Sequence, residues 1–288
     1  MEKRLSPTSI FTTAWNITRS DYWRHFGIIL LIIFLYVLLS LIISSLTMGN
    51  MILNLQALQE AQQTGNVDEL IMQTYSGNLG GIILNMILSL ILNVFFTILL
   101  LGYALDTVKD RYESIGTLFK RYVNWHNLLN VLMYNLILSF VIIIPFIILM
   151  VLMYAVGGLK FGTVSLIILV ILLIYIVIRL ILTPYYILDK NMDFINAISA
   201  SWSSMAGNVW PVLGFILLLI LAFLGIFLII IGIGVIFSEM GGGIAALGIL
   251  LAVVLYIFAI ITMELMEIFG IAYSYKEISG SSEIITEE

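Results

Sequence analysis

The sequence predicts an all-α, polytopic membrane protein, a bundle of six transmembrane helices with amphipathic helices at the cytoplasmic interface. Of its 288 residues, 62% are hydrophobic and 10% are charged, whereas charged residues make up about a quarter of an ordinary soluble domain. Six long stretches contain no Asp, Glu, Lys or Arg. A hydrocarbon core about 30 Å thick requires about 20 apolar residues per helix, so each stretch is long enough to cross it once.

The spans follow one another in a single integral membrane domain, residues 1–288. They are Phe26 to Leu46, Gly80 to Tyr103, Asn127 to Met153, Thr163 to Thr183, Pro211 to Phe237 and Gly243 to Gly270. Short connections between the third and fourth spans, and between the fifth and sixth, predict two tight helical hairpins. The longest loop, 47–79, has capped, amphipathic segments, and we expect it to form a small helical cap on the extracytoplasmic side.

Basic residues set the expected orientation, because Lys and Arg in short loops resist translocation. Of the 12 basic residues, 11 fall on one side of the predicted bundle and only Lys160 falls on the other. We therefore expect a plasma-membrane protein with both termini, including the tail 276–288, in the cytoplasm. The tryptophans agree, because each lies beside a cytoplasmic end of a span, where an amphipathic ring prefers the lipid headgroups. These interfacial anchors are Trp15, Trp23, Trp125, Trp202 and Trp210.

Three amphipathic segments precede the odd-numbered spans and are expected to lie flat on the cytoplasmic surface: 7–24, 114–125 and 193–207. Ser6 and Pro7 form an N-cap and first-turn pair for the first segment, and Asp193 caps the last. Trp15 and Trp23 are eight residues apart, as are Trp202 and Trp210. Two interpretations stay open. Either the chain repeats three modules, each an interfacial helix followed by a transmembrane hairpin, or every helix entering from this side needs its own anchor.

Polar side chains inside the spans are candidates for function, because polar groups at membrane depth usually face protein or a water-filled cavity. The second span carries a stripe in which every fourth residue is polar: Asn85, Ser89, Asn93 and Thr97. The third span has a shorter polar side that includes Asn127, Asn130 and Asn135. The pattern predicts either a hydrophilic path for a substrate or hydrogen bonds that hold neighbouring helices together.

A second candidate is an intramembrane charge cluster. Arg179 lies about one turn inside the cytoplasmic end of the fourth span, and Glu264 and Glu267 lie at comparable depth in the sixth. If the two helices are adjacent, ion pairing would offset the cost of burying all three groups and would form a gate or a proton-linked site. The alternative is that each long side chain extends to the headgroups.

The composition argues against several functions. A net charge of −5 with scattered basic residues excludes nucleic-acid binding, and the absence of cysteine excludes disulfides and thiolate metal sites. No motif indicates catalytic, cofactor-binding or metal-binding residues, since His25 and His126 lack the spacing of known ligand pairs. We therefore expect no enzyme and no cofactor. The expected partners are membrane lipids, together with either a protein partner or a second copy of the chain.

One motif resembles that of a known family. It consists of Arg179-Leu-Ile-Leu-Thr-Pro-Tyr-Tyr-Ile-Leu-Asp189, then Ala197-Ile-Ser-Ala-Ser-Trp202, Gly207-Asn208 and Trp210. This pattern resembles an uncharacterised bacterial family of six-span membrane proteins related to the membrane domain of some glycerophosphodiester phosphodiesterases. In those enzymes the chemistry belongs to a separate soluble domain, so no catalytic residue carries over. The resemblance implies a membrane module that handles lipids or assists partners.

The sequence therefore predicts a non-enzymatic integral membrane protein, either transport-related or a membrane accessory that handles a small molecule or lipid. The alternative is a membrane scaffold that recruits partner proteins through its cytoplasmic amphipathic helices. A lipid-modifying enzyme that uses His25 or His126 ranks last, because neither histidine has a recognisable catalytic partner in sequence.

Overall fold

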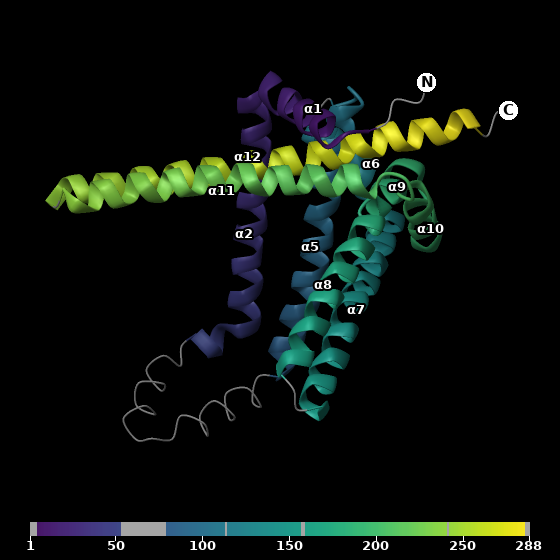
Figure 1. Cartoon of the computed structure of the whole chain (residues 1–288). Helices are drawn as coiled ribbons and strands as arrows, with labels where there is room; N and C mark the ends of the chain where they lie inside the picture. Colours follow the sequence, from purple (N-terminus) through teal and green to yellow (C-terminus); the bar gives the residue numbers. More distant parts are fainter. Residues whose placement is uncertain (1–4, 53–78, 113, 157–158, 241, 286–288) are drawn as a thin grey trace. The chain divides into compact units, whose positions relative to one another are not determined.

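The computed structural model describes residues 5–52, 79–112, 114–156, 159–240 and 242–285, and within these ranges the protein is helical and contains no strand (Figure 1). Six segments are long and apolar enough to cross a membrane. They lie in α2 (Tyr22–Ile52), α5 (Leu79–Val108), α7 (Trp125–Val156), α8 (Leu159–Leu180) with α9 (Thr183–Lys190), α11 (Val209–Glu239) and α12 (Gly242–Ile285). The prediction of an all-α polytopic membrane protein is confirmed.

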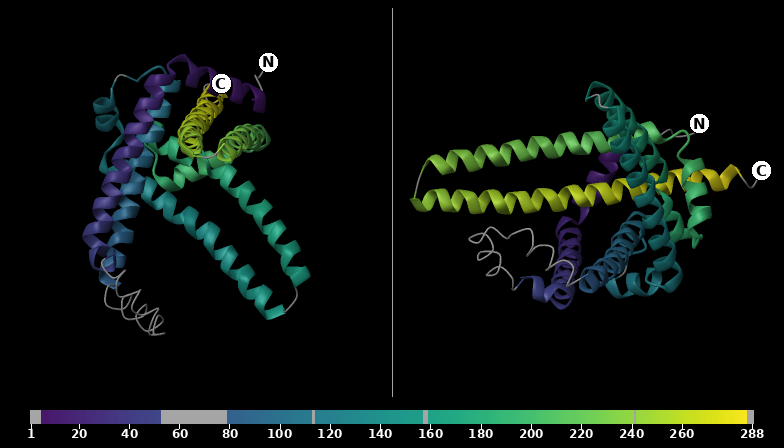
Figure 2. Two further views of the ribbon diagram at one scale, coloured as in Figure 1. Left: turned by 90° about the vertical axis from the view of Figure 1, so that its left-hand side faces the viewer. Right: turned by 90° about the horizontal axis from the view of Figure 1, so that it is seen from below.

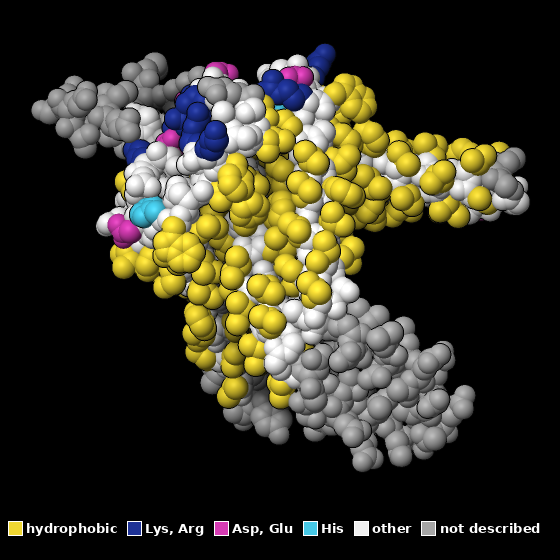
Figure 3. All heavy atoms as spheres, turned by 180° about the vertical axis from the view of Figure 1, so that it is seen from behind, with side chains coloured by type: hydrophobic (Ala, Val, Ile, Leu, Met, Phe, Trp, Pro, Cys, Tyr) yellow, Lys and Arg dark blue, Asp and Glu magenta, His cyan; other side chains and the backbone are white. Residues whose placement is uncertain are grey.

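The long helices have an apolar surface, which is suited to contact with lipid rather than with water. Figure 3 shows hydrophobic side chains, in yellow, covering these helices. The Lys and Arg side chains, in dark blue, gather near the top of the view. Large apolar side chains such as Leu221 and Leu228 are 64% and 67% exposed. Soluble monomers rarely expose contiguous apolar patches of this extent. The protein is therefore a multi-pass membrane protein.

The chain forms two compact units, one of residues 1–29 and 98–288 and the other of residues 30–97. The smaller unit pairs α2 with α5. There, the Asn85 side-chain amide donates hydrogen bonds of 3.2 Å to Ser44 Oγ and 2.8 Å to Thr47 Oγ1. The Tyr36 and Phe96 rings meet edge to face with their centroids 5.5 Å apart.

Three short helices begin where the sequence places an N-cap: α1 (Pro7–Ser20), α6 (Ile115–Tyr122) and α10 (Phe194–Ser204). Ser6 and Ser114 each form a capping box with the residue three positions later, and Asp193 accepts from the backbone N–H of Asn196. Each short helix precedes two long helices in the chain. The order of secondary structure thus follows the pattern of three modules, α1-α2-α5, α6-α7-α8 and α10-α11-α12.

In the larger unit, α7 packs against α8 and α11 against α12 as the two expected hairpins (Figure 2). α1 packs on both α11 and α12, and buries Ile10, Ala14 and Thr18 completely. The contact between α1 and α11 is close, because a Cβ built at Gly214 would lie 2.6 Å from Pro7 Cγ. A glycine at this position therefore lets the short helix approach the hairpin.

Two details differ from the sequence prediction. The fourth span does not end in a simple turn, since a separate helix, α9, follows it, with Pro184 in its first turn and a buried run from Thr183 to Leu188. The segment 276–288 is also not a tail over its described part, because α12 continues to Ile285. Of the expected helical cap 47–79, residues 53–78 lie outside the described ranges.

Candidate functional site

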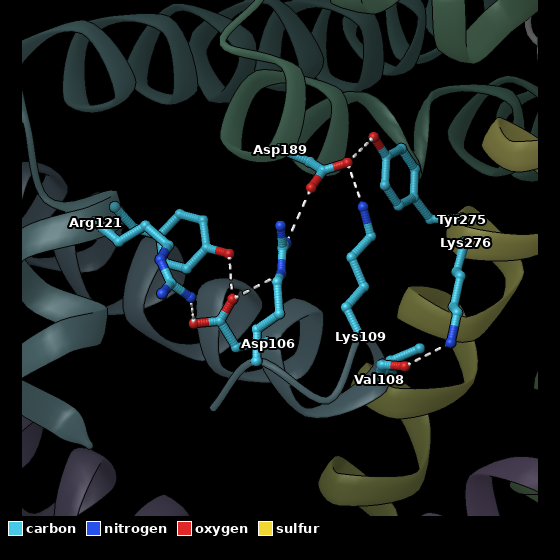
Figure 4. Close-up of polar contacts among 9 residues, drawn as sticks. Asp106, Val108, Lys109, Arg121, Asp189, Tyr275 and Lys276 are labelled. Atoms are coloured by element: carbon cyan, nitrogen blue, oxygen red, sulfur yellow. Dashed lines mark hydrogen bonds and ion pairs between the residues drawn. The ribbon is translucent and has the colours of Figure 1, made fainter. Parts of the chain in front are cut away.

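Two buried carboxylates form the centre of the candidate site (Figure 4). Asp106 lies in the last turn of α5 and Asp189 near the end of α9, and their side chains are only 1% and 8% exposed. Removing a charged group from water is costly unless it is paired and hydrogen-bonded. Each of these two carboxylates therefore needs partners, and the partners come from neighbouring helices.

Asp106 connects α5 with α6. Arg121 Nη1 donates to its Oδ2, and the Tyr122 hydroxyl donates a 2.7 Å hydrogen bond to its Oδ1. Arg111 Nε lies 3.6 Å from the same Oδ1. The hydrogen bond to Asp106 and its negative charge raise the pKa of the Arg121 guanidinium. Arg121 thus stays charged and bound across the range of physiological pH.

Asp189 connects α9 with α12 and with the turn that follows α5. Its Oδ2 accepts from Lys109 Nζ at 2.6 Å and from the Tyr275 hydroxyl at 2.8 Å. Its Oδ1 accepts from Arg111 Nη2 at 3.1 Å. Beside it, Lys276 Nζ donates a 2.9 Å hydrogen bond to the carbonyl of Val108, the last residue of α5, where a cation is favoured by the helix dipole.

Arg111 contacts both carboxylates, so the two halves form one network, here called the ionic clasp. It consists of Asp106, Lys109, Arg111, Arg121, Tyr122, Asp189 and Tyr275. The turn after α5 positions Arg111 for this role: Asp110 has a left-handed φ of 54°, and the Arg111 N–H bonds to the Asp106 carbonyl at 2.7 Å. This is the hydrogen-bond pattern of a Schellman C-cap. The clasp joins helices from all three modules.

A polar pocket of about 320 Å³ adjoins the clasp. Residues 17–25, at the junction of α1 and α2, form one wall, and residues 106–112 form the other. Arg24 Nη1 lies 2.9 Å from Asp21 Oδ2, and its guanidinium carbon lies 4.8 Å from the centroid of the Tyr112 ring. Burial raises the pKa of Tyr112, and the charge of Arg24 opposes this shift.

His25 also lines the pocket. Its side chain is 2% exposed, and Nδ1 shares a short hydrogen bond with the Tyr103 hydroxyl. The Thr107 Oγ1 atom is buried in the same wall of the pocket. Asp106 also lines this pocket, so one carboxylate belongs both to the pocket and to the ionic clasp.

The polar stripe of the second span lies in the smaller unit. Asn85 is bonded to α2 as described above, and Ser89 Oγ donates to Asn85 Oδ1 at 3.0 Å. Asn93 is exposed and Thr97 is half-buried. At Asn85, therefore, the stripe forms the interhelical hydrogen bonds that the second interpretation predicts.

The polar residues of the third span lie in the larger unit and act locally. Asn127 donates to the Tyr122 carbonyl at 2.9 Å, and Asn130 Oδ1 accepts a 2.9 Å hydrogen bond from the backbone N–H of Phe194, at the start of α10. The Asn135 carbonyl accepts from Ser139. Asn127 and Asn130 thus hold short helices to α7.

The predicted pairing of Arg179 with Glu264 and Glu267 does not appear among the ion pairs of the described residues. Arg179 instead donates to the Trp202 carbonyl, and its guanidinium lies over the Trp202 ring. Packing explains the difference, because α10 packs against α8 and brings the Trp202 ring to the Arg179 guanidinium. All five predicted anchors have exposed rings, from 40% for Trp202 to 76% for Trp210.

The two histidines do not share a site with Asp189. His25 contacts Tyr103 and Phe269, whereas Asp189 is held by Lys109, Arg111 and Tyr275. Within the described part of the chain, no three His, Cys, Asp or Glu side chains are grouped as metal ligands. The arrangement combines a polar pocket with ion pairs that hold helices together.

Sequence reasoning missed Asp106, Lys109, Arg111 and Tyr275. The available signal was the alternation of acidic and basic residues directly after the second span, because mixed charges at the end of an apolar helix require nearby partners. Comparison with known proteins adds no relative: no family model, curated protein or solved structure matches the chain.

Proposed function

We propose that this protein is a non-enzymatic, transport-related or membrane-accessory protein that handles a small molecule or lipid, with the polar pocket as its ligand site. The observation that carries the proposal is the double role of Asp106, which lines the pocket and is also held in the ionic clasp. A ligand that changes the surroundings of this carboxylate changes the contacts that join the three modules. Membrane transporters built from repeats work by rocking such modules against one another.

Flux into liposomes tests the transport form of this proposal. Purified protein is reconstituted, and labelled small molecules are screened against empty liposomes. Arg111→Gln, which removes the cation shared by both carboxylates, should change the rate for any substrate found. Lys120→Gln is the matched control, since Lys120 is exposed on α6 and belongs to neither pocket nor clasp. Equal rates for both variants would contradict a role of the clasp in transport.

A second candidate function, a membrane scaffold, is favoured by the hydrogen bonds of Asn85. A polar stripe that bonds a neighbouring helix needs no substrate. Asn85→Leu should then lower the thermal stability of the protein without altering any flux. Loss of flux together with unchanged stability would favour the conduit instead.

We also propose that the chain lies in a bacterial-type plasma membrane with both termini in the cytoplasm, a topology supported by the distribution of Lys and Arg. Because the chain has no cysteine, single cysteines can be placed freely. Asn16→Cys, on an exposed position of α1, should resist an impermeant thiol reagent in intact cells, whereas Gln62→Cys should react. The reverse labelling pattern would invert the topology.

A relation to the six-span family named above remains part of the proposal. It is supported by contacts inside the motif: Ser201 Oγ donates to the Arg179 carbonyl at 2.8 Å, and Arg179 Nη1 donates to the Trp202 carbonyl at 2.8 Å. The two halves of the motif thus stabilise one another. The resemblance implies a membrane module that handles lipids or assists partners, and this agrees with the proposed function.

A further inference from the structure

The surroundings of Arg24 indicate which kind of ligand the polar pocket takes. Its guanidinium lies between the Asp21 carboxylate, at 2.9 Å, and the face of the Tyr112 ring, at 4.8 Å from the ring centroid. A carboxylate on one side and an aromatic face on the other is the environment in which proteins bind organic cations. The chain's own arginine therefore shows that this part of the pocket accommodates a planar cation.

The charge of the lining also favours a cation. Three carboxylates, those of Asp21, Asp106 and Asp110, line the pocket together with one permanent cation, Arg24. Asp106 is already neutralised by Arg111 and Arg121 in the clasp. If Arg24 swings out, Asp21 and Asp110 line the cavity without it. An anion would meet two carboxylates there.

Arg24 is free to leave this position. Its side chain is 46% exposed, and its ion pair with Asp21 spans one helical turn at the surface. Exposed pairs of this kind contribute little to stability. The volume of about 320 Å³ is at the lower limit of small-molecule sites, which suits a ligand with a short alkyl chain.

We propose that the pocket binds a small organic cation, an alkyl guanidinium or primary amine, and that Arg24 occupies this site in the ligand-free protein. This inference rests on the proposed function only in taking the pocket as the ligand site. A ligand displaces the Arg24 guanidinium and takes its place between Asp21 and Tyr112. Arg24 is then an internal competitor that limits the affinity of the site.

Binding to the purified full-length protein in detergent tests the inference by calorimetry. The probes are butylguanidinium, its uncharged isostere butylurea, and inorganic phosphate. Butylguanidinium should bind, and neither of the others should. Arg24→Gln should tighten butylguanidinium binding about tenfold, because it removes the internal competitor. Arg19→Gln is the matched control, since Arg19 is exposed on α1 and does not line the pocket.

Asp110→Asn provides an independent arm. Asparagine tolerates the left-handed backbone of this position, so the turn is retained while one charge is lost. Its affinity for butylguanidinium should fall about tenfold. Thermal unfolding of the ligand-free variants verifies that each is folded. If Arg24→Gln does not fold, the Asp110→Asn result decides alone.

Unchanged or weaker butylguanidinium binding by folded Arg24→Gln would overturn the inference, as would unchanged binding by Asp110→Asn. Binding of phosphate that is lost in Arg24→Gln would show that the arginine is instead the ligand of an anion. These measurements report binding and not flux. A protein that binds butylguanidinium but transports nothing would contradict only the transport proposal. A protein that does not bind it would contradict only the cation inference.

Discussion

The guanidinium of Arg179 lies over the indole ring of Trp202, 4.5 Å from the ring centroid, and also donates a 2.8 Å hydrogen bond to the carbonyl oxygen of that residue. The planar, weakly hydrated guanidinium is well suited to such stacking. Through this pair, the end of α8 is fixed to α10. Among the described residues, this contact takes the place of the ion pairs with Glu264 and Glu267, which were one of two interpretations of the sequence.

A double-mutant cycle measures the strength of this contact. Arg179→Gln and Trp202→Leu should show a coupling energy on the order of 1 kcal/mol in the free energy of unfolding. Either substitution alone already removes the cation–π contact, so the double variant does not lose it a second time. The same cycle with Glu264→Gln should give a coupling near zero. A larger coupling with Glu264 than with Trp202 would restore the charge cluster.

Asp189→Asn should destabilise the protein strongly. It leaves Lys109 and Arg111 without their shared carboxylate in a largely buried position, a loss of about 2 kcal/mol in unfolding free energy. The measurement is thermal unfolding in detergent. Asp193→Asn is the control: asparagine caps a helix as well as aspartate does, so the melting temperature should not change. Equal effects of the two substitutions would argue against the clasp.

Gly102→Ala should destabilise the contact between α5 and α6. A Cβ at this position would lie 2.5 Å from the Tyr122 ring, which is fully buried and held by Asp106. Such overpacking costs about 1–3 kcal/mol. Gly225→Ala, with nothing within 4 Å of its Cβ, should instead be neutral or slightly stabilising, because alanine favours helix. A neutral Gly102→Ala would mean that the ring moves freely.

Alkaline pH should weaken the wild-type protein more than Tyr122→Phe. Burial, followed by the hydrogen bond to Asp106 and its negative charge, raises the pKa of Tyr122 above the value of about 10 in an unfolded chain. The contribution to stability is therefore complete below that pH and is lost as the pH rises above it. Denaturant unfolding between neutral and strongly alkaline pH should show a shallower decline for the variant, and parallel declines would contradict the assignment.

Local chemistry explains which elements were predictable. The spans follow from apolar length alone, and Ser6 and Asp193 cap their helices through backbone groups three residues away. α9 is absent from the prediction, which ends the fourth span at Thr183, although Pro184 is suited to the first turn of a new helix.

The ionic clasp could be predicted only in part, because the mixed charges after the second span indicate that partners are needed but not which residues supply them. Asp106, Arg121, Asp189 and Tyr275 meet only after four helices have packed, and no periodicity in the chain records that meeting. The sequence shows the polar stripe, but it cannot decide between a hydrophilic path and interhelical hydrogen bonds. That choice depends on whether the neighbouring helix carries hydrogen-bond partners. At Asn85, the hydroxyls of Ser44 and Thr47 supply the partners.

The length of α12 has a mechanical consequence. At about 1.5 Å per residue, its 44 residues extend for roughly 66 Å, more than twice the thickness of a hydrocarbon core. Much of this helix must therefore project beyond the acyl chains as a rigid rod. Because Tyr275 and Lys276 bond this end to Asp189 and to the end of α5, a spin label near Gly280 would report the opening of these bonds as a displacement of the helix end.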